Sequence, residues 1–473
     1  MSWTQINQKV SLVLFSILIP ILSFGQDAAQ AEMGLDDRIN EWFTPISQLM
    51  QDIVLHNFPG SAAVFGQPVP SIIILLVAGA TFFTFYFGFV NIRRFGLAIN
   101  VVRGKYDDVE DHSTPEKAAV NINDGDIART IRDEGEDGEV SHFQALATAV
   151  SGTVGNGNIA GVALAIALGG PGATFWMILC GLIGMSTKFV ECTLGVKYRD
   201  VGPDGTVYGG PMYYMTKGLK EMGFVNLGKI LAGVFAVLCI GASFGGGNAA
   251  QSNQAVVQLV DSFGMSGGSA RTIMGLILAV LVGIIIIGGI KRIASVTEKV
   301  VPFMALMYLI ACLYILGVNY MHIGSAFGQI FGQAFSPQAG LGGLMGVLIV
   351  GFQRAAFSNE AGAGSASIAH SAVKTKYPAS EGLVALLEPF IDTVVICTMT
   401  ALVIIIFNHG GGQFAYGDAG GGGVMIDGEL VQGAAITSRA FGAYIPFAGP
   451  FLTVAVVLFA VSTMISWLSL IHI

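Results

Sequence analysis

Long apolar stretches recur along this sequence, and they constrain the fold more than any other feature. A helix needs about 20 predominantly apolar residues to cross the hydrocarbon core of a bilayer. Only 11% of the residues are charged, whereas soluble proteins have about 25%, so the composition excludes water-soluble folds. We therefore predict an all-α polytopic membrane protein with spans at residues 71–92, 142–168, 172–195, 227–258, 272–290, 300–319, 339–372, 382–407 and 447–467.

The net charge of −8 comes from one segment. Residues 105–139 contain 12 acidic and 4 basic side chains, and the rest of the chain contains 19 of each kind. The segment is highly charged and poor in aromatic residues, which is typical of a solvated insertion. A calcium loop is the alternative, but the segment lacks the DxDxDG spacing. No basic run is available for phosphate contacts, so nucleic acid is not an expected partner.

The N-terminal region has the pattern of an export signal. An apolar stretch at residues 10–24 is too short to span a bilayer, and a small-x-small pattern, Ala29-Gln30-Ala31, follows it. Residues 1–31 are therefore predicted to be a signal sequence, the alternative being an uncleaved N-terminal helix. Residues 32–69 are expected to form an amphipathic segment on the outer side, before a transmembrane domain at 70–467.

Basic residues predict the orientation of the spans. They follow the first, third, fifth and seventh spans, and the other loops are poor in Lys and Arg, with Arg271 and Arg439 the main exceptions. Cytoplasmic loops carry the excess of Lys and Arg in membrane proteins, so the odd-numbered spans should end in the cytoplasm. The acidic segment 105–139 then forms a cytoplasmic insertion.

The second span contains residues that are unusual in a lipid-facing helix. The run Ser151-Gly152-Thr153-Val154-Gly155-Asn156-Gly157-Asn158-Ile159-Ala160-Gly161 has glycines that permit unusual backbone angles and asparagines that replace lost backbone partners. Non-helical backbone survives in a membrane only where it lines a polar cavity or contacts protein. A broken helix here would present N–H groups to a carboxylate and carbonyls to a small cation. The alternative is a GxxxG packing face formed by Gly157 and Gly161.

Other spans also contain polar residues. Arg354 and Glu360 in the seventh span are costly in a membrane, so they should form a gating or a structural ion pair. Gln251 and Asn253 in the fourth span either bind substrate or join helices. Ser462 and Thr463 in the ninth span are hydroxyls that suit sodium. Glu388 and Asp392, at i and i+4, share a helix face and suit either a proton relay or ordinary solvation near the cytoplasmic end. Lys188 and Glu191 in the third span are expected to reach the cytoplasmic interface by snorkelling.

Covalent chemistry has little support in the sequence. The five cysteines and seven histidines are scattered without metal-ligand spacing, and no HExxH motif is present. We expect no enzyme activity, no cofactor and no bound metal beyond a coupling ion. An integral-membrane enzyme and a simple channel are the alternatives, and two separate breaks favour a binding site over a continuous pore.

Several motifs together resemble the alanine or glycine:cation symporter family of amino-acid carriers. They extend over roughly residues 75–466, and the chain is identified as a member on five of them, Gly155–Ala163 continuing to Gly169–Met177, Lys188–Arg199, Gly209–Tyr214, Phe357–Gly362 and Phe390–Thr393. The resemblance implies an inverted-repeat sodium-symporter fold, in which one extra helix precedes two repeats of five helices. About nine of these eleven spans are present, so a C-terminally incomplete chain with an off-pattern tail at 468–473 is expected.

The resemblance also implies a function and a set of binding residues. It implies secondary active import of a small neutral amino acid, alanine or glycine, with sodium by alternating access. A proton-coupled transporter is the alternative. Substrate would bind at Thr153, Gly155, Asn156, Gly157, Asn158, Gln251, Asn253 and Phe357, and the cation at Ala149, Gly152, Asn158, Ser462 and Thr463. We expect a monomer in the lipid bilayer of a bacterial inner membrane.

Overall fold

A computed structural model describes residues 35–65, 68–106, 138–202, 205–265, 268–336, 343–409, 412–417 and 422–472. The chain divides into two units, Met1–Leu55 and His56–Ile473. In the first unit, residues Leu35–Val54 form helix α2, which contains Pro45. The predicted signal sequence and nearly all of the predicted insertion lie outside the described residues.

The second unit is helical apart from two short antiparallel hairpins, β1–β2 and β3–β4. Its first half contains α3 (Ser61–Phe65), α4 (Ser71–Tyr86), α5 (Val90–Arg93), α6 (Phe95–Val102), α9 (His142–Thr153), η2 (Asn156–Asn158), α10 (Ala160–Gly169), α11 (Gly172–Lys197), β1 (Asp200–Val201), β2 (Val207–Tyr208), α12 (Pro211–Glu221), α13 (Val225–Ala242), η3 (Ser243–Ala249) and α14 (Ala250–Ser262). The remainder contains α15 (Gly268–Ile286), α16 (Gly289–Val318), α17 (Tyr320–Ala334), α18 (Gly343–Asn359), α19 (Ser365–Ser371), α20 (Pro378–Ala385), α21 (Leu387–Pro389), η4 (Phe390–Cys397), α22 (Thr398–Phe407), β3 (Val424–Ile426), β4 (Glu429–Val431), α23 (Ala434–Gly442) and α24 (Ala448–His472).

Five helical segments among the described residues are long and apolar enough to cross a membrane. A sixth crossing is obtained if the bent pair of α9 with η2 and α10 is one span. The remaining predicted spans do not meet this length test. Helix α4 and the apolar part of α15, Ala270–Ile286, are too short, and the 339–372 window divides between α18 and α19. The chain is therefore a multi-pass membrane protein by its helices, and the nine-span count and the five-plus-five repeat stay predictions.

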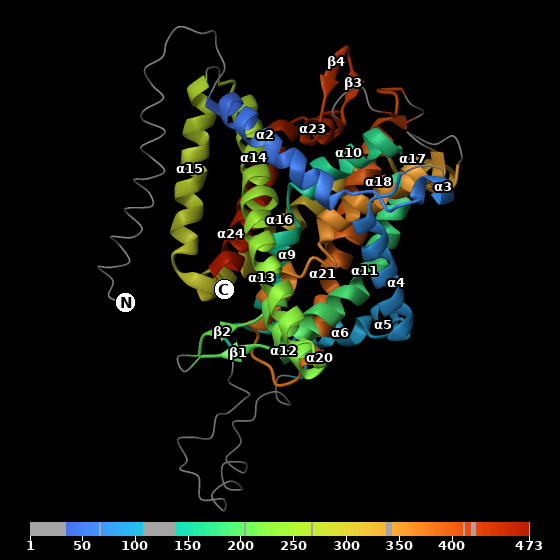
Figure 1. Cartoon of the computed structure of the whole chain (residues 1–473). Helices are drawn as coiled ribbons and strands as arrows, with labels where there is room; N and C mark the ends of the chain where they lie inside the picture. Colours follow the sequence, from blue (N-terminus) through green and yellow to red (C-terminus); the bar gives the residue numbers. More distant parts are fainter. Residues whose placement is uncertain are drawn as a thin grey trace, which may run out of the picture. The chain divides into compact units, whose positions relative to one another are not determined.

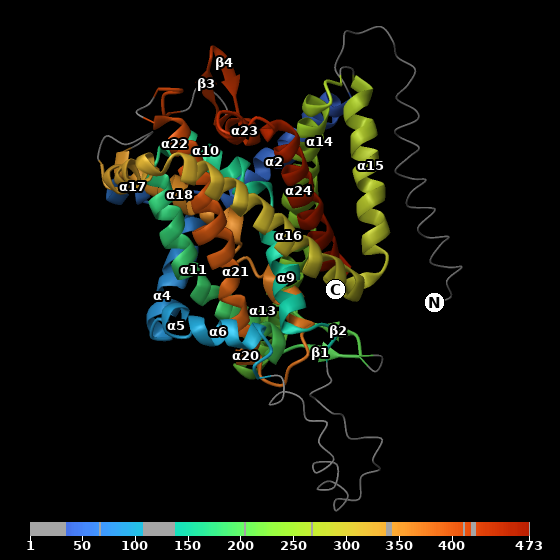
Figure 2. The same cartoon turned by 180° about the vertical axis from the view of Figure 1, so that it is seen from behind.

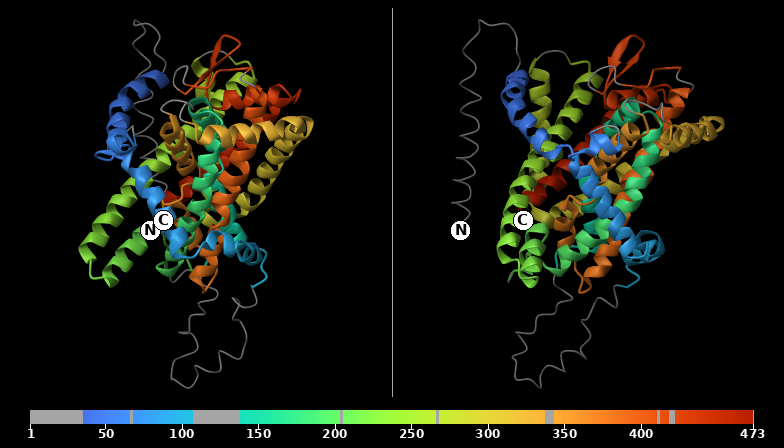
Figure 3. Two further views of the ribbon diagram at one scale, coloured as in Figure 1. Left: turned by 90° about the vertical axis from the view of Figure 1, so that its right-hand side faces the viewer. Right: turned by 45° about the vertical axis from the view of Figure 1, so that its right-hand side comes forward.

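The helix ends are arranged as the charge pattern predicts. The elements beside the basic loops, α5, α6, the β1–β2 hairpin and α20, lie at one end of the second unit, and β3–β4 with α23 lie at the other (Figures 1 and 2). The continuous α13–η3–α14 helix and α15 stand together on one side (Figure 3). Sorting the basic loops to one end agrees with the predicted orientation.

The core lies where α9, α10, α16, α22 and α24 meet. Its members are small and branched residues together with a few large side chains. Tyr308 on α16 stacks on Phe441 and also contacts Phe459 of α24, and all three are buried. The Tyr308 hydroxyl has a partner in the Thr400 hydroxyl at 2.8 Å. This aromatic cluster fixes α16 and α24 beside the first half of the broken span.

Candidate functional site

The second predicted span is broken where the glycines and asparagines cluster. Helix α9 begins with a capping box, in which the Ser141 hydroxyl and the Gln144 side chain each accept a backbone N–H of the other residue. The helix ends at Thr153, a three-residue 3₁₀ turn follows at Asn156–Asn158, and α10 begins at Ala160 after a bend of 58°. The Asn158 amide oxygen accepts the Gly155 N–H at 2.9 Å, which replaces a helical bond lost at the break.

A glutamine of the fourth predicted span contacts the break directly. Gln251 on α14 is buried, and its side-chain oxygen accepts the backbone N–H of Asn156 at 3.1 Å. The Asn156 side-chain oxygen is also buried and has no hydrogen-bond partner in the described part of the chain. This oxygen is therefore an acceptor directed at the break that a bound group with N–H donors would satisfy.

The break is also tied to the second broken helix through a buried carboxylate. Asp392 in the π-helical segment η4 accepts hydrogen bonds from the side-chain amide of Asn158 at 2.6 Å and from the hydroxyls of Ser358 at 2.8 Å and Thr393 at 2.7 Å. Asp392 is fully buried and makes no ion pair among the described residues. This burial excludes the ordinary solvation that the sequence allowed for Asp392. A single carboxylate thus joins the two interrupted helices.

The second break follows α18. Backbone angles in the left-handed region at Glu360, Gly362 and Gly364 turn the chain before α19 begins at Ser365. Only glycine adopts such angles at no steric cost, and for this reason the glycines recur here. The Glu191 carboxylate of α11 accepts the N–H groups of Gly362 and Gly364, each at 3.2 Å. Glu191 therefore caps the break and is buried, whereas the sequence suggested that it reaches the interface.

Two hydroxyls of α24, those of Thr463 and Ser466, lie against the first broken helix. A Cβ built on Gly155 would be 2.5 Å from the Thr463 hydroxyl, and the Ser466 hydroxyl donates to the Thr148 carbonyl at 3.0 Å. The Ser462 hydroxyl instead donates to Phe459 and to Met304 of α16. Beside them lies a cavity of about 20 Å³, enough for one water or one small ion, whose lining includes Ala149, Gly152, Thr153, Ser466, Glu360 and Glu388.

The structure brings most, but not all, of the predicted residues together. Phe357 lies about 4.0 Å from a Cβ built on Gly157, so it is close to the break although 57% exposed. Asn253 lies on the exposed face of α14, because residues two apart on a helix point to different sides. The Asn158 side-chain amide donates to Asp392 and not to a residue of α24.

The alternative of a GxxxG packing face at Gly157 and Gly161 has no support at Gly161. A Cβ on Gly161 would contact nothing within 4 Å in the described residues, which argues against close helix packing there.

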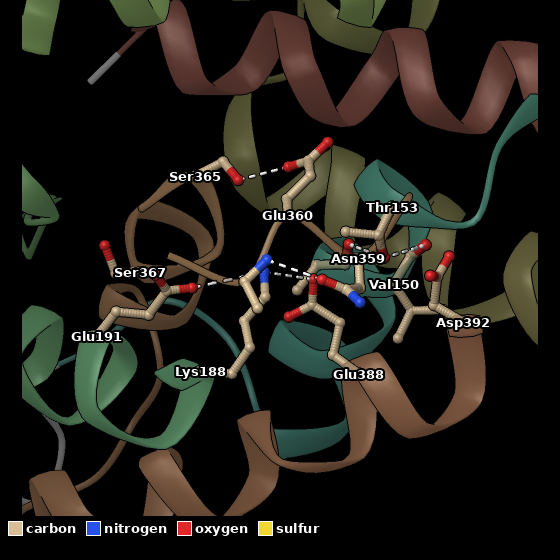
Figure 4. Close-up of polar contacts among 12 residues, drawn as sticks. Val150, Thr153, Lys188, Glu191, Asn359, Glu360, Ser365, Ser367, Glu388 and Asp392 are labelled. Atoms are coloured by element: carbon tan, nitrogen blue, oxygen red, sulfur yellow. Dashed lines mark hydrogen bonds and ion pairs between the residues drawn. The ribbon is translucent and has the colours of Figure 1, made fainter. Parts of the chain in front are cut away.

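The predicted pair of Arg354 and Glu360 is not formed. The Glu360 carboxylate accepts the Ser365 hydroxyl, and the Arg354 Nε is buried with no hydrogen-bond partner in the described residues. The buried cation beside the second break is Lys188 instead. Its ammonium lies 2.9 Å from Glu388 and 3.5 Å from Glu191, as Figure 4 shows. Full burial of Lys188 differs from the interfacial position suggested by the sequence, because its ammonium pairs with Glu388 of α21 inside the protein.

Sequence reasoning missed a histidine cluster next to this lysine. The Nδ1 atoms of His142 and His370 contact the two oxygens of the Glu381 carboxylate, although their sequence spacing gave no signal. A G-x-S-x-G pattern at residues 241–245 also occurs, but it lies inside a continuous helix, across the junction of α13 and η3, rather than on a strand-to-helix turn. Its Ser243 hydroxyl donates to the Trp467 carbonyl at 2.8 Å, so the pattern is structural.

Two interrupted helices that face each other inside a multi-pass helical protein are the arrangement of a secondary transporter. Residues 55–472 match the Sodium:alanine symporter family, and the chain belongs to that family. The chain is 40% identical to the sodium/alanine symporter AgcS of Methanococcus maripaludis over 84% of this chain and 78% of that protein. It is 34% identical to the amino-acid carrier protein AlsT of Bacillus subtilis over 83% of this chain and 72% of that protein. The family consists of transporters and not of enzymes.

Proposed function

We propose that this protein imports a small neutral amino acid, alanine or glycine, together with sodium across a bacterial inner membrane. The observation that carries the proposal is the break between α9 and α10, which faces Gln251 and lies next to the second break. Interrupted spans are the places where transporters bind substrate and coupling ions near mid-membrane. The family's description names sodium and alanine, and the relatives above are named for alanine and amino-acid transport.

The substrate carboxylate is proposed to bind at the start of α10, around Gly155–Asn158. A helix N-terminus carries partial positive charge and favours an anion. The substrate ammonium is proposed to donate to the unpartnered Asn156 oxygen, while Gln251 holds the Asn156 backbone. Thr153, Gly157 and Phe357 complete the proposed pocket. Asn253 contributes only if α14 rotates, since its side chain is exposed.

The cation is proposed to bind between α9 and α24. Ala149 and Gly152 line the ion-sized cavity beside the break, and Thr463 and Ser466 present hydroxyls to the same side of α9. Sodium prefers oxygen ligands of this kind. The Ser462 hydroxyl donates to Met304 of α16 and to Phe459, so Ser466 takes its place in the proposed site. Binding of sodium would fix the end of α9 and thereby order the carboxylate site.

The proposed mechanism is alternating access with two inverted five-helix repeats, preceded by α4. The two breaks would be the first helices of the two repeats, and the unit is proposed to act as a monomer. Equilibrium binding tests the coupling directly. Purified protein should bind radiolabelled alanine more tightly as sodium increases, and alanine should tighten sodium binding by the same factor, as linkage requires. Alanine affinity that is equal in sodium and in choline would contradict the proposed coupling.

A further inference from the structure

Two histidines from separate helices meet at the end of the second unit that is opposite to the basic loops. His322 lies in the first turn of α17, and His409 follows the last turn of α22. Helices α17 and α22 contact each other there (Figure 2). The centroids of the two imidazole rings are 4.3 Å apart, and the ring planes are inclined by 43°. No metal-ligand spacing marks this pair in the sequence, because its members are far apart in the chain.

Both imidazoles are accessible from the side of the membrane that the charge pattern assigns to the outside. His409 is exposed and His322 is half-buried. Within the described part of the chain, no hydrogen bond or ion pair engages either ring. A neutral imidazole has one nitrogen lone pair, so each ring has a lone pair available to a ligand from outside.

The separation of the rings suits two imidazoles that share one transition-metal ion. A histidine nitrogen lies about 2.0–2.1 Å from a bound zinc ion, so the ring centroid lies roughly 3.2 Å from the metal. Two such rings have centroids about 4.5 Å apart at an N–metal–N angle of about 90°, and about 5.2 Å apart at a tetrahedral angle. The observed 4.3 Å differs from these values by less than about 1 Å, which side-chain rotation supplies.

The donor atoms select the kind of metal. Imidazole nitrogen suits zinc, copper and nickel, whereas hard cations such as the proposed coupling ion, sodium, prefer oxygen ligands. The described residues contain no group of three or more His, Cys, Asp or Glu side chains that could hold a metal, so water would fill the other positions around an ion at this pair. The site therefore differs from the proposed sodium site between α9 and α24 both in its elements and in its chemistry.

We propose that His322 and His409 bind one divalent transition-metal ion of the zinc class from the outer side, and that this ion links α17 to α22. Helix α17 is already fixed to α11, because the Trp176 indole N–H donates to the Ala334 carbonyl at 3.0 Å. Helix α22 continues the η4 segment, whose Asp392 joins the two breaks. A bound metal ties α22 to α11 through α17, so transport should slow when the ion is present. The metal site rests on the ring geometry, and only its transport consequence rests on the proposed function.

Zinc binding to untagged full-length protein in lipid nanodiscs tests the site without transport. Equilibrium dialysis with radioactive Zn²⁺ compares the wild type with His322→Ala, His409→Ala and the double variant, and His56→Ala, which removes an exposed histidine of another segment, is the control. Two ligands held together act at a high effective concentration, so each single variant should bind this zinc at least about tenfold more weakly, and the double variant should add little further loss. His56→Ala should match the wild type. Zinc affinity of either single variant within twofold of the wild type would overturn the proposal, as would equal zinc binding by the wild type and the double variant.

Uptake into proteoliposomes tests the consequence. External Zn²⁺, at the concentration that saturates the site in dialysis, should slow labelled alanine uptake severalfold in the wild type and in His56→Ala but not in His322→Ala. An external chelator should restore the wild-type rate. Equal responses to zinc in the wild type and His322→Ala would contradict the transport consequence. If the wild type transports no alanine or glycine at all, the proposed transport function fails, and the dialysis measurements still decide the metal site.

Discussion

Gly155 is the most closely packed glycine of the first break, and replacing it by alanine tests the contact between the break and α24. Gly155 has extended backbone angles that any residue adopts, so Gly155→Ala acts through space alone. The new Cβ would lie 2.5 Å from the Thr463 hydroxyl and 3.2 Å from the Gln251 side-chain oxygen. Both neighbours are buried, and each makes a hydrogen bond that fixes it.

The size of the effect follows from that contact. Thr463 must rotate and lose its bond to Phe459, or the backbone must shift by several tenths of an ångström. Inserting a methyl group into a packed site of this kind costs roughly 1–3 kcal/mol. Such a cost corresponds to about a 5- to 150-fold change in an equilibrium, so sodium-driven alanine uptake should fall by at least about fivefold.

Gly161→Ala is the matched control for Gly155→Ala. Gly161 is the second residue of α10, and a Cβ there would contact nothing within 4 Å in the described residues. Alanine has a higher helix propensity than glycine and meets no neighbour at this position, so uptake by Gly161→Ala should equal or exceed that of the wild type. Rates in proteoliposomes are compared at equal amounts of folded protein, measured by size-exclusion chromatography. Uptake by Gly155→Ala within twofold of Gly161→Ala would refute the placement of Gly155.

Three further predictions use the contacts around the breaks. Lys188→Met leaves Glu388 buried without its cation and should destabilise the protein by about 3–5 kcal/mol. Arg439→Met, the control, breaks an exposed pair with Glu429 worth at most about 1 kcal/mol. Thermal unfolding in detergent compares the two variants, and equal melting temperatures would contradict the burial argument. Gln251→Leu removes the acceptor of the Asn156 N–H, and a buried unsatisfied donor costs about 1–3 kcal/mol, so alanine binding should weaken by about fivefold or more. The alanine affinity of Asn253→Leu, measured in the same way by equilibrium dialysis, should stay within twofold of the wild type. Asp392→Asn weakens the three hydrogen bonds that the Asp392 carboxylate accepts between the breaks and should reduce alanine uptake at least tenfold. Asp427 is exposed, and Asp427→Asn should leave uptake unchanged. Equal uptake by the two variants would rule out a joining role for Asp392.

The sequence predicted the first break well because the signal is local. Gly155, Asn156 and Asn158 are adjacent, and glycine and asparagine have few other reasons to cluster inside an apolar span. Family resemblance placed Gln251 beside this break, and the structure gives it a direct bond to Asn156. The resemblance could not tell that Gln251 faces the break and Asn253 does not, because the face of α14 that meets α24 depends on the preceding π-helical turn.

The ionic contacts could not be predicted, because they join residues far apart in the chain. His142 and Glu381 are separated by 239 positions, and Lys188 and Glu388 by 200. A lysine or glutamate near a span end has the same sequence signal whether it reaches water or pairs inside. The sequence therefore suggested an interfacial Lys188 and an Arg354–Glu360 pair, and the structure buries Lys188 among carboxylates instead.

Sodium-gradient-driven uptake tests the central claim most directly. Purified protein in proteoliposomes, loaded with potassium and diluted into sodium, receives labelled alanine or glycine at fixed pH and zero membrane potential. The account predicts transient accumulation above the external concentration, lost when sodium is equal on both sides. Uptake that only equilibrates, with the same time course with and without the sodium gradient, would contradict sodium-coupled transport.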